Sequence, residues 1–257
     1  MSDFTPTPER HKQILSMLIK QGRLSVVEIV RQFSISEATA RRDLGSLASQ
    51  GKVQRVHGGV IAIEQAPPEM PILERATEQA EEKARIGRVA AELIADKETV
   101  FIGSGTTALE VARNLRNRKG LTVITNSLAV LNMLAGNREM TVIALGGMLR
   151  DSELSFIGHI TEQALAEVRA DKVIMGTRGV SLKHGLTNDY LQETLTDRAI
   201  LQTGREVIIV ADHTKVNRVA TALLAPLKSI HTLVTDSKAD KKFVQVLKKL
   251  KIQVIVA

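Results

Sequence analysis

Two groups of side chains in this sequence could bind an anion, and they lie far apart in the chain. The first is the pair Arg41-Arg42, in a stretch with helical spacing. Arginine presents a planar fork of donors that binds phosphate or the edge of guanine with two hydrogen bonds. The second is a run rich in glycine and hydroxyl groups at 103–107, where a strand pattern changes to a helix pattern. Such a turn presents free backbone N–H groups to an anion. The sequence therefore predicts two anion-binding regions of different construction.

Three helices and a hairpin are predicted before residue 64. Apolar spacing predicts a helix over 8–21, and Ser25 can cap a second, short helix. Ser36 can cap a third helix, which Gly51 stops. Two alternating runs over 52–63 then surround a His-Gly-Gly turn, which is typical of a β-hairpin. Two helices, a short turn, a third helix and a hairpin form the arrangement of a winged helix-turn-helix.

The third of these helices is predicted to carry the arginine pair on its outer face. Ala40 and Leu44 recur at helical spacing and therefore face inward. At 100° per residue Arg42 then points outward, and Arg41 lies beside it. Residues 9–60 hold nine Lys and Arg against four acids, an excess that suits a polyanion such as DNA. A small helical dimerisation module with a solvated basic face is the alternative interpretation.

The second anion-binding region is the run Gly103, Ser104, Gly105, Thr106 and Thr107. Its backbone N–H groups and hydroxyls suit a single phosphate. The glycine spacing also satisfies a loose dinucleotide fingerprint, but the acid that this fingerprint needs about 20 residues later is missing. A tight turn that binds nothing is the third interpretation.

Other polar or glycine-rich segments also follow candidate strands. They are Asn126-Ser127, Gly146-Gly147, Gly176-Thr177-Arg178-Gly179 and Asp212-His213-Thr214-Lys215. Because the carboxyl ends of parallel strands meet at one edge of a sheet, these segments are expected to lie together. Lys215 could supply a point charge to a phosphate there. The sequence therefore predicts a ligand pocket at this edge.

The fold class predicted for the larger part of the chain is α/β, with a Rossmann-like sheet. Short β-branched runs predict strands at 99–102, 121–125, 141–145, 172–175, 206–211, 232–235 and 252–256. Helix patterns between them include 108–115, 128–134, 160–168, 191–201 and 239–250. Three of the six prolines fall within 64–71 and predict a linker. We therefore expect a winged helix-turn-helix over 1–63 and an α/β domain over 72–257.

Composition excludes several other chemistries. The chain has no cysteine, which removes disulfides and thiolate chemistry. The six histidines show no metal-binding spacing, so neither a metal nor another cofactor is expected. The first residues are too few and too polar for a signal peptide, and no run is apolar enough to span a membrane. We expect a cytoplasmic protein that makes no membrane contact.

The N-terminal module resembles the DeoR family of bacterial repressors through a motif and its wing. These are Arg10-x3-Ile14-x3-Leu18 with Ser36-x2-Thr39-Ala40-Arg41-Arg42-Asp43-Leu44, and Val56-His57-Gly58-Gly59. The resemblance implies that the third helix contacts double-stranded operator DNA and that the wing contacts its backbone. Asp43 would instead orient an arginine within the module. The implied DNA-binding residues are Ser36, Glu37, Ala38, Thr39, Arg41, Arg42, Lys52, Arg55 and His57.

The larger domain resembles the effector domain of the same family, which is similar to the ribose-5-phosphate isomerase fold. The resemblance implies that a phosphorylated sugar binds there, with its phosphate on Gly105, Thr106 and Thr107. The implied effector-binding residues are Gly103, Ser104, Gly105, Thr106, Thr107, Asn126, Ser127, Gly146, Gly147, Arg178, Glu193 and Lys215.

The sequence departs from the isomerases in the residues that would position a sugar for catalysis. Arg178 stands where many family members have an acid, and it would meet the phosphate or a second anionic group of the ligand. Glu193 could still serve as the base of a sugar-phosphate isomerase, which is the alternative function. The main prediction is a repressor of a sugar-metabolism operon that is controlled by a sugar phosphate and catalyses nothing. We expect a homo-oligomer, either a dimer or a tetramer.

Overall fold

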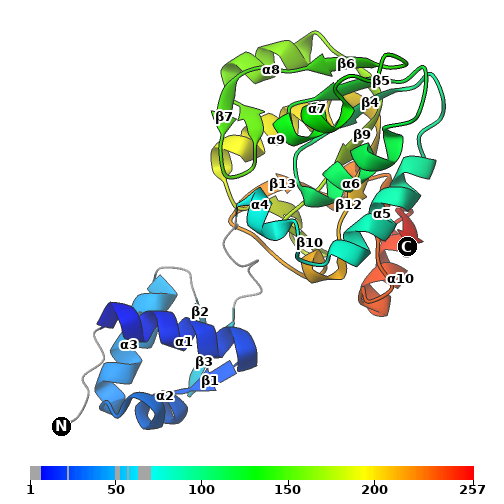
Figure 1. Cartoon of the computed structure of the whole chain (residues 1–257). Helices are drawn as coiled ribbons and strands as arrows, with labels where there is room; N and C mark the ends of the chain where they lie inside the picture. Colours follow the sequence, from blue (N-terminus) through cyan, green and yellow to red (C-terminus); the bar gives the residue numbers. More distant parts are fainter. Residues whose placement is uncertain (1–6, 22, 50–52, 57, 63–70) are drawn as a thin grey trace. The chain divides into compact units, whose positions relative to one another are not determined.

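The computed structural model describes residues 7–21, 23–49, 53–56, 58–62 and 71–257 (Figure 1). Internal contacts divide the chain into two compact units, Met1–Gln65 and Ala66–Ala257. The predicted linker over 64–71 lies outside the described residues, apart from Pro71. Lys52 and His57 of the predicted DNA contacts also lie outside them.

The first unit contains three helices and a small antiparallel sheet. The helices are α1 (Thr7–Gln21), α2 (Val26–Phe33) and α3 (Glu37–Ser49), and the strands are β1 (Arg23–Ser25), β2 (Val53–Val56) and β3 (Gly59–Ala62). The predicted hairpin is present as β2 and β3, and β1 extends it to the strand order β1-β3-β2. The three residues of β1 are too few to show an alternating pattern in the sequence.

Local sequence signals begin the second and third helices where they were predicted. The Ser25 hydroxyl accepts a hydrogen bond from the backbone N–H of Glu28, and the Glu28 carboxylate accepts one from that of Ser25. This reciprocal capping box satisfies two N–H groups that the helix itself leaves unpaired. Ile14, Leu44 and Leu47 are buried in the core between the helices. The predicted inward face of α3 is therefore confirmed.

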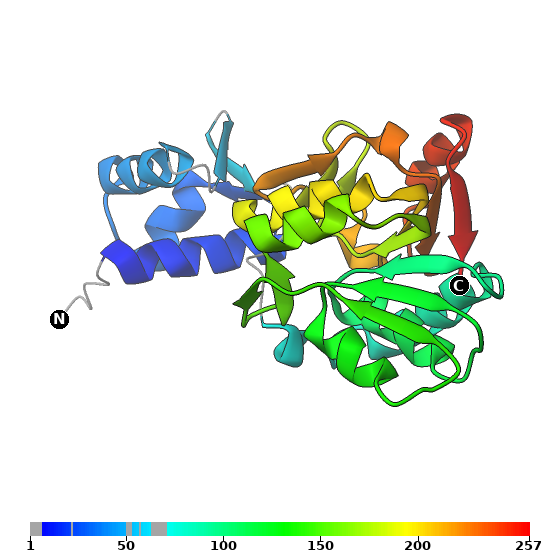
Figure 2. The ribbon, with the colours of Figure 1, turned by 90° about the horizontal axis from the view of Figure 1, so that it is seen from above.

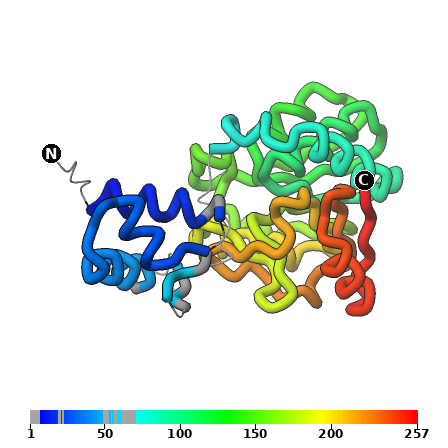
Figure 3. Tube along the Cα trace, turned by 90° about the horizontal axis from the view of Figure 1, so that it is seen from below, coloured from blue at the N-terminus to red at the C-terminus, as the bar shows by residue number. Residues whose placement is uncertain are grey.

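The second unit is built on a seven-stranded parallel sheet. Its strands are β4 (Thr99–Ile102), β5 (Thr122–Thr125), β6 (Thr141–Ala144), β9 (Ala170–Met175), β12 (Gly204–Val210), β14 (Thr232–Thr235) and β15 (Gln253–Val256). They pair in the order β15-β14-β12-β9-β4-β5-β6. These are the seven predicted strands, with ends that differ by no more than two residues. Figure 3 follows the trace to β15, the C-terminal strand at one edge of the sheet.

Helices cover both faces of this sheet (Figure 2). They are α5 (Ala80–Glu92), α6 (Thr106–Leu115) and α7 (Leu128–Leu134) on one face, and α8 (His159–Ala166), α9 (Leu191–Leu201) and α10 (Lys241–Lys249) on the other. Successive strand residues point to opposite faces, so Val100 packs in one core and Phe101 in the other. Both faces are buried, which explains the continuous apolar runs in the sequence.

Several short elements of this unit were not predicted. They are α4 (Ile72–Arg75), β7 (Met148–Arg150), β8 (Ser155–Ile157), β10 (Gly179–Ser181), β11 (Gly185–Asn188), β13 (Ala222–Ala225) and the 3-10 turns His213–Lys215 and Leu227–Ser229. β7 and β8 form a hairpin, and β10, β11 and β13 form a small antiparallel sheet. Segments of three or four residues carry too little periodicity to be recognised. These elements nevertheless supply many of the side chains around the site described below.

Candidate functional sites

The N-terminal end of α3 presents a polar, cationic surface. The Ser36 hydroxyl accepts a hydrogen bond from the Thr39 backbone N–H at 3.2 Å and lies 2.9 Å from the Thr39 hydroxyl. Arg41 and Arg42 are exposed, and Arg42 lies on the face opposite the buried core residues of the helix, with Arg41 beside it. The predicted cap and the outward direction of Arg42 are confirmed.

The two arginines differ in what they contact. The Arg41 Nε atom lies 3.0 Å from Oε1 of Glu37, four residues earlier, and both side chains are about 60% exposed. Arg42 forms no ion pair with any residue in the described part of the chain. Ser36 and Ala38 are exposed on the same stretch, Thr39 is partly exposed, and Arg55 is exposed on β2. This surface could contact a duplex without first breaking a buried interaction.

Asp43 is buried, unlike its exposed neighbours Arg41 and Arg42. Its carboxylate accepts hydrogen bonds from Arg10 of α1 at 2.6 and 3.2 Å, and it lies 3.2 Å from Nε2 of His11. Burial raises the pKa of Asp43, but the hydrogen bonds from Arg10 and His11 outweigh it and leave the pKa below its usual value. The prediction that Asp43 orients an arginine within the module is confirmed, and the arginine is Arg10.

A polar cavity of about 60 Å³ lies at the carboxyl edge of the parallel sheet. The turn after β4 enters it with Ser104, Gly105, Thr106 and Thr107, and the turn after β9 enters it with Thr177 and Arg178. Asp212 and Lys215 come from the end of β12, and Glu193 comes from α9. Three of the predicted strand ends therefore meet, as expected for the ligand-binding edge of a parallel sheet.

Other residues predicted to bind the effector do not line this cavity. Gly103 lies inside the sheet end, where its N–H donates to the Ile174 carbonyl. Asn126 donates to the Phe156 carbonyl, and the Ser127 hydroxyl caps α7 by accepting from the Val130 N–H. These side chains form hydrogen bonds with backbone groups that the parallel sheet does not pair. Polar residues are common at strand ends for this reason.

Gly146 and Gly147 also lie away from the cavity lining. The Thr161 hydroxyl of α8 donates to the Gly146 carbonyl at 2.8 Å. A Cβ atom on Gly147, whose φ is +151°, would lie 2.1 Å from Thr161 Oγ1. Glycine is therefore needed here because α8 approaches the backbone closely.

The cavity is completed by residues that the sequence did not point out. Arg75, Glu78 and Lys83 come from the α4–α5 segment, Glu153 from the β7–β8 turn, and Asp189 from the segment before α9. None of them follows a strand of the large sheet, so the strand-end pattern could not find them. They reach the cavity only because α4, α5 and the β7–β8 turn pack beside the sheet edge.

Two lysines in the cavity have no carboxylate partner within hydrogen-bonding distance among the described residues. Lys83 is buried, and its Nζ donates to the Arg75 carbonyl at 2.8 Å. Burial lowers the pKa of Lys83, opposed by the nearby charge of Asp212, and the charge of Lys215 lowers it further. The pKa of Lys215 is lowered by burial and by Arg178 and Arg75, with Asp212 again opposing. Cations that depress one another's pKa values in this way favour an added anion.

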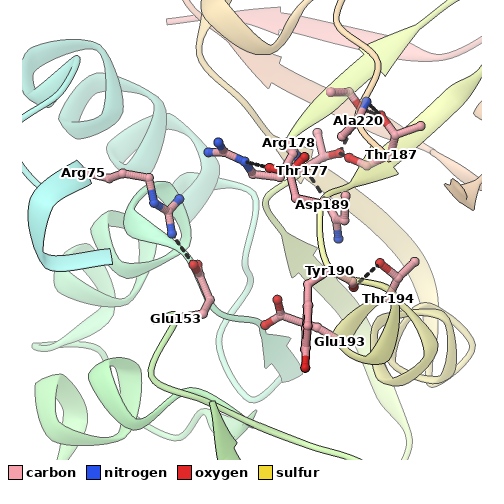
Figure 4. Close-up of polar contacts among 12 residues, drawn as sticks. Arg75, Glu153, Thr177, Arg178, Thr187, Asp189, Tyr190, Glu193, Thr194 and Ala220 are labelled. Atoms are coloured by element: carbon pink, nitrogen blue, oxygen red, sulfur yellow. Dashed lines mark hydrogen bonds and ion pairs between the residues drawn. The ribbon is translucent and has the colours of Figure 1, made fainter. Parts of the chain in front are cut away.

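The arginines of the cavity, by contrast, already contact carboxylates (Figure 4). Arg178 Nε lies 2.9 Å from Asp189, and Arg75 forms an ion pair with Glu153. Glu193 forms an ion pair with Arg150 and accepts a hydrogen bond from the Ser155 hydroxyl at 2.6 Å. The Glu193 carboxylate is therefore held by Arg150 and Ser155 and is not free to accept a proton from a sugar.

Among the described residues, no group of three or more His, Cys, Asp or Glu side chains could hold a metal ion. No helix in that part of the chain is long and apolar enough to cross a membrane.

The two units define a class: DNA-binding regulators in which a helix-turn-helix is followed by a separate sensor domain. The family described as the DeoR-like helix-turn-helix domain matches residues 10–66, and the DeoR C terminal sensor domain matches residues 78–237. The chain belongs to the DeoR family of transcriptional regulators.

Curated relatives match nearly the whole chain. The glycerol-3-phosphate regulon repressor of Escherichia coli is 36% identical over 93% of this chain and 94% of its own. The transcriptional repressor AccR of Agrobacterium fabrum is 32% identical over 99% of both chains. Among solved structures, ribose 5-phosphate isomerase A from Neisseria gonorrhoeae matches 55% of both chains at 19% identity, with a TM-score of 0.41. A score this low supports no conclusion about shape or activity.

Proposed function

We propose that this protein represses genes of sugar metabolism and is released or retained on its operator by a phosphorylated sugar. The regulators named above supply the first support, since one of them represses a glycerol-3-phosphate regulon. We further propose that the protein is cytoplasmic and forms a homo-oligomer, either a dimer or a tetramer. Paired helix-turn-helix units bind two half-sites and so gain affinity that one unit lacks. Light scattering of the purified protein tests the oligomeric state.

The observation that carries the effector assignment is the pair of lysines beside the glycine-rich turn. Lys83 and Lys215 line the cavity with Gly105, Thr106 and Thr107 at the beginning of α6. The helix dipole, the backbone N–H groups and two hydroxyls add to the same attraction. A dianionic phosphate ester satisfies this combination better than a neutral sugar does. Arg178 would contact the phosphate or a second anionic group.

The proposed DNA contacts are those of the polar end of α3, with Arg41 and Arg42 as readers of base edges or phosphates. Arg55 and the wing would contact the backbone. The effector must bind one arrangement of the protein more tightly than the other, because equal affinity for both would leave operator binding unchanged.

Catalysis is not part of the proposal. The alternative, a sugar-phosphate isomerase, needs Glu193 as a proton-abstracting base. Arg150 and Ser155 hold that carboxylate in place, and Arg178 stands where many family members have an acid that would help to position the sugar. An isomerase assay on pentose and hexose phosphates separates the two functions, since turnover at ordinary enzymatic rates would favour the enzyme.

Thermal unfolding in the presence of glycerol 3-phosphate and other sugar phosphates tests the effector site. A ligand that binds only the folded protein raises its melting temperature. Thr106→Val and Lys215→Met should lose this rise, whereas the exposed Lys241→Met should retain it. If the two cavity variants respond like the parent, the effector binds elsewhere.

A further inference from the structure

Glu153 places a carboxylate against the turn that is proposed to hold the phosphate. A Cβ atom on Gly105 would lie 3.6 Å from Oε1 of Glu153, and Glu153 itself lines the cavity. Gly105 directly precedes α6, whose first N–H groups and dipole stabilise a negative charge. The protein without ligand therefore already has an anionic oxygen beside its phosphate-binding turn.

The same carboxylate holds α4, the first element of the second unit. Arg75 is the last residue of α4, and its guanidinium pairs with Glu153 (Figure 4). The two side chains are 9% and 5% exposed. The backbone adds a second link, since the Ile72 N–H donates to the Ser152 carbonyl at 2.7 Å. The turn that carries Glu153 is thus joined to both ends of α4.

α4 lies where the second unit begins, so a movement of α4 moves the end of the connecting segment. α4 follows residues 63–70, which connect it covalently to the helix-turn-helix unit. A displacement of the Glu153 turn would move α4 through Arg75 and Ile72. It would thereby move the point at which the chain from the DNA-binding unit enters the sensor unit.

We propose that Glu153 is an internal substitute for the effector's phosphate, and that the phosphate displaces it, takes over Arg75 and so moves α4. The inference rests on the proposed function, because it requires a phosphate ester in this cavity. It names the residues through which ligand binding would reach the DNA-binding unit.

Two physical arguments support an exchange rather than simple addition. A phosphate and the Glu153 carboxylate cannot share the turn at Gly105 without strong repulsion between like charges. Arg75 loses nothing in the exchange, since a guanidinium binds phosphate with the same paired geometry as carboxylate.

The competing interpretation is that the Arg75–Glu153 pair is a fixed brace, which holds α4 in one place with or without ligand. Both interpretations predict loss of stability when the pair is removed. They differ in whether α4 moves when phosphate binds, so the test must measure that position directly.

The absence of cysteine from the chain allows spin labels to be attached at two chosen sites. Leu73 of α4 is 76% exposed, and Asn114 lies exposed on α6. Double electron–electron resonance on the full chain with Leu73→Cys and Asn114→Cys then reports the distance from α4 to α6, a helix that packs on the parallel sheet. Inorganic phosphate is the probe, with sodium chloride at equal ionic strength as the control, and thermal unfolding of the same sample reports binding.

The exchange predicts a change in the Leu73–Asn114 distance when phosphate binds to the parent. In Glu153→Gln, phosphate should bind about tenfold more tightly because the competing charge is gone, and the distance without phosphate should move toward the bound value. In Arg75→Gln, phosphate should bind more weakly and the distance should stay unchanged.

Asp189→Asn is the matched control. It removes another carboxylate that pairs with a cavity arginine, but that arginine, Arg178, follows β9 and is not part of α4. Phosphate should bind it more tightly, yet its distance without phosphate should equal that of the parent.

Two results would overturn the exchange and leave the proposed function intact. One is a melting temperature that rises with phosphate while the labelled distance stays constant in the parent, a measurement that needs no cavity variant to fold. The other is a Glu153→Gln protein that binds phosphate no more tightly than the parent. If neither phosphate nor any sugar phosphate stabilises the parent, the proposed effector site itself is wrong, and the exchange fails with it.

Discussion

The helix α3 and the cavity of the sensor unit both use arginine and carboxylate pairs, but at opposite ends of the range of burial. Arg41 and Glu37 are about 60% exposed, so water screens their attraction. Arg75 and Glu153 are less than 10% exposed, where an unpaired charge is strongly unfavourable. Removing the partner of Arg41 should therefore change the free energy of unfolding little, whereas the buried Arg75 guanidinium needs an anion beside it.

This difference follows from what each surface binds. Duplex DNA is a large polyanion that an exposed cation can approach by releasing counterions, with no rearrangement of the protein. A small effector would instead enter a cavity where Arg75 is buried, and Arg75 needs a counter-charge before the effector arrives. Under the proposals above, binding to α3 is an addition, whereas binding in the cavity is an exchange of one anion for another.

The largest effect is expected from a buried pair in the DNA-binding unit itself. Asp43→Asn leaves Arg10, which is 2% exposed, without its counter-charge and should lower the free energy of unfolding of this unit by about 3 kcal/mol. Denaturant unfolding of the full chain measures this, with Glu37→Gln as the exposed control. A loss below about 1 kcal/mol would mean that burial does not separate the two kinds of pair.

The pH dependence of that pair has a defined sign. The folded-state pKa of Asp43 lies below its usual value, so its stabilising contribution is fully present above the unfolded pKa of about 3.9. It is lost as the pH falls through the lower folded pKa. The difference in free energy of unfolding between the parent and Asp43→Asn should therefore become smaller in this acid range.

Arg42→Ala is expected to have the next largest effect. It removes an exposed cation without disturbing a buried contact, so folding should be unchanged, while affinity for the operator should fall by about 1–3 kcal/mol. Fluorescence anisotropy with a duplex selected from a random library measures the loss. Equal affinity of the variant and the parent for that duplex would exclude Arg42 from the contact surface.

The cavity lysines predict a smaller effect that depends on pH. The pKa values of Lys83 and Lys215 are lowered by burial, so both should lose their protons at a pH below the ordinary lysine value of about 10.4. Above pH 8 a phosphate ester is already a dianion, and its stabilising effect should decline as the pH rises further. Thermal unfolding with glycerol 3-phosphate from pH 8 to 10 tests this, and Lys83→Met should bind more weakly with a flatter profile. A constant response over this range would contradict the lysine assignment.

The smallest effect is expected from Glu37→Gln. The exposed ion pair with Arg41 contributes less than about 1 kcal/mol, so stability should hardly change. Affinity for any duplex at low salt should rise a few-fold, because a negative charge beside the DNA phosphates is removed. A salt titration measures the rise, and a fall in affinity would show that Glu37 contacts a base rather than merely holding Arg41.

The sequence predicted those features that depend on residues close together in the chain. Ser25 and Ser36 cap helices through residues three positions later, and the outward direction of Arg42 follows from the helical period alone. Strands buried on both faces appear as unbroken apolar runs, so all seven strands of the parallel sheet were found.

The prediction of the cavity was less complete, and the reason is again physical. Asn126 and Ser127 follow a strand just as Arg178 does, but their hydrogen bonds go to the backbone beside them. Polar residues at a strand end can serve either the turn or a ligand, and local sequence does not distinguish these roles. Arg75 and Lys83 likewise show no common pattern in the sequence, since Arg75 ends the short helix α4 and Lys83 lies in the next helix, α5.

By itself, then, the sequence determined the two-part organisation, the DNA-facing helix and the glycine-rich turn, because each depends on periodicity or on contacts within a few residues. Only the tertiary structure decided which charges share the cavity. Glu153 is 78 residues from Arg75 and 48 from Gly105 in the chain, and the hairpin and α4 bring all three together. Charge pairing in a buried site depends on distance in space, which no local pattern records.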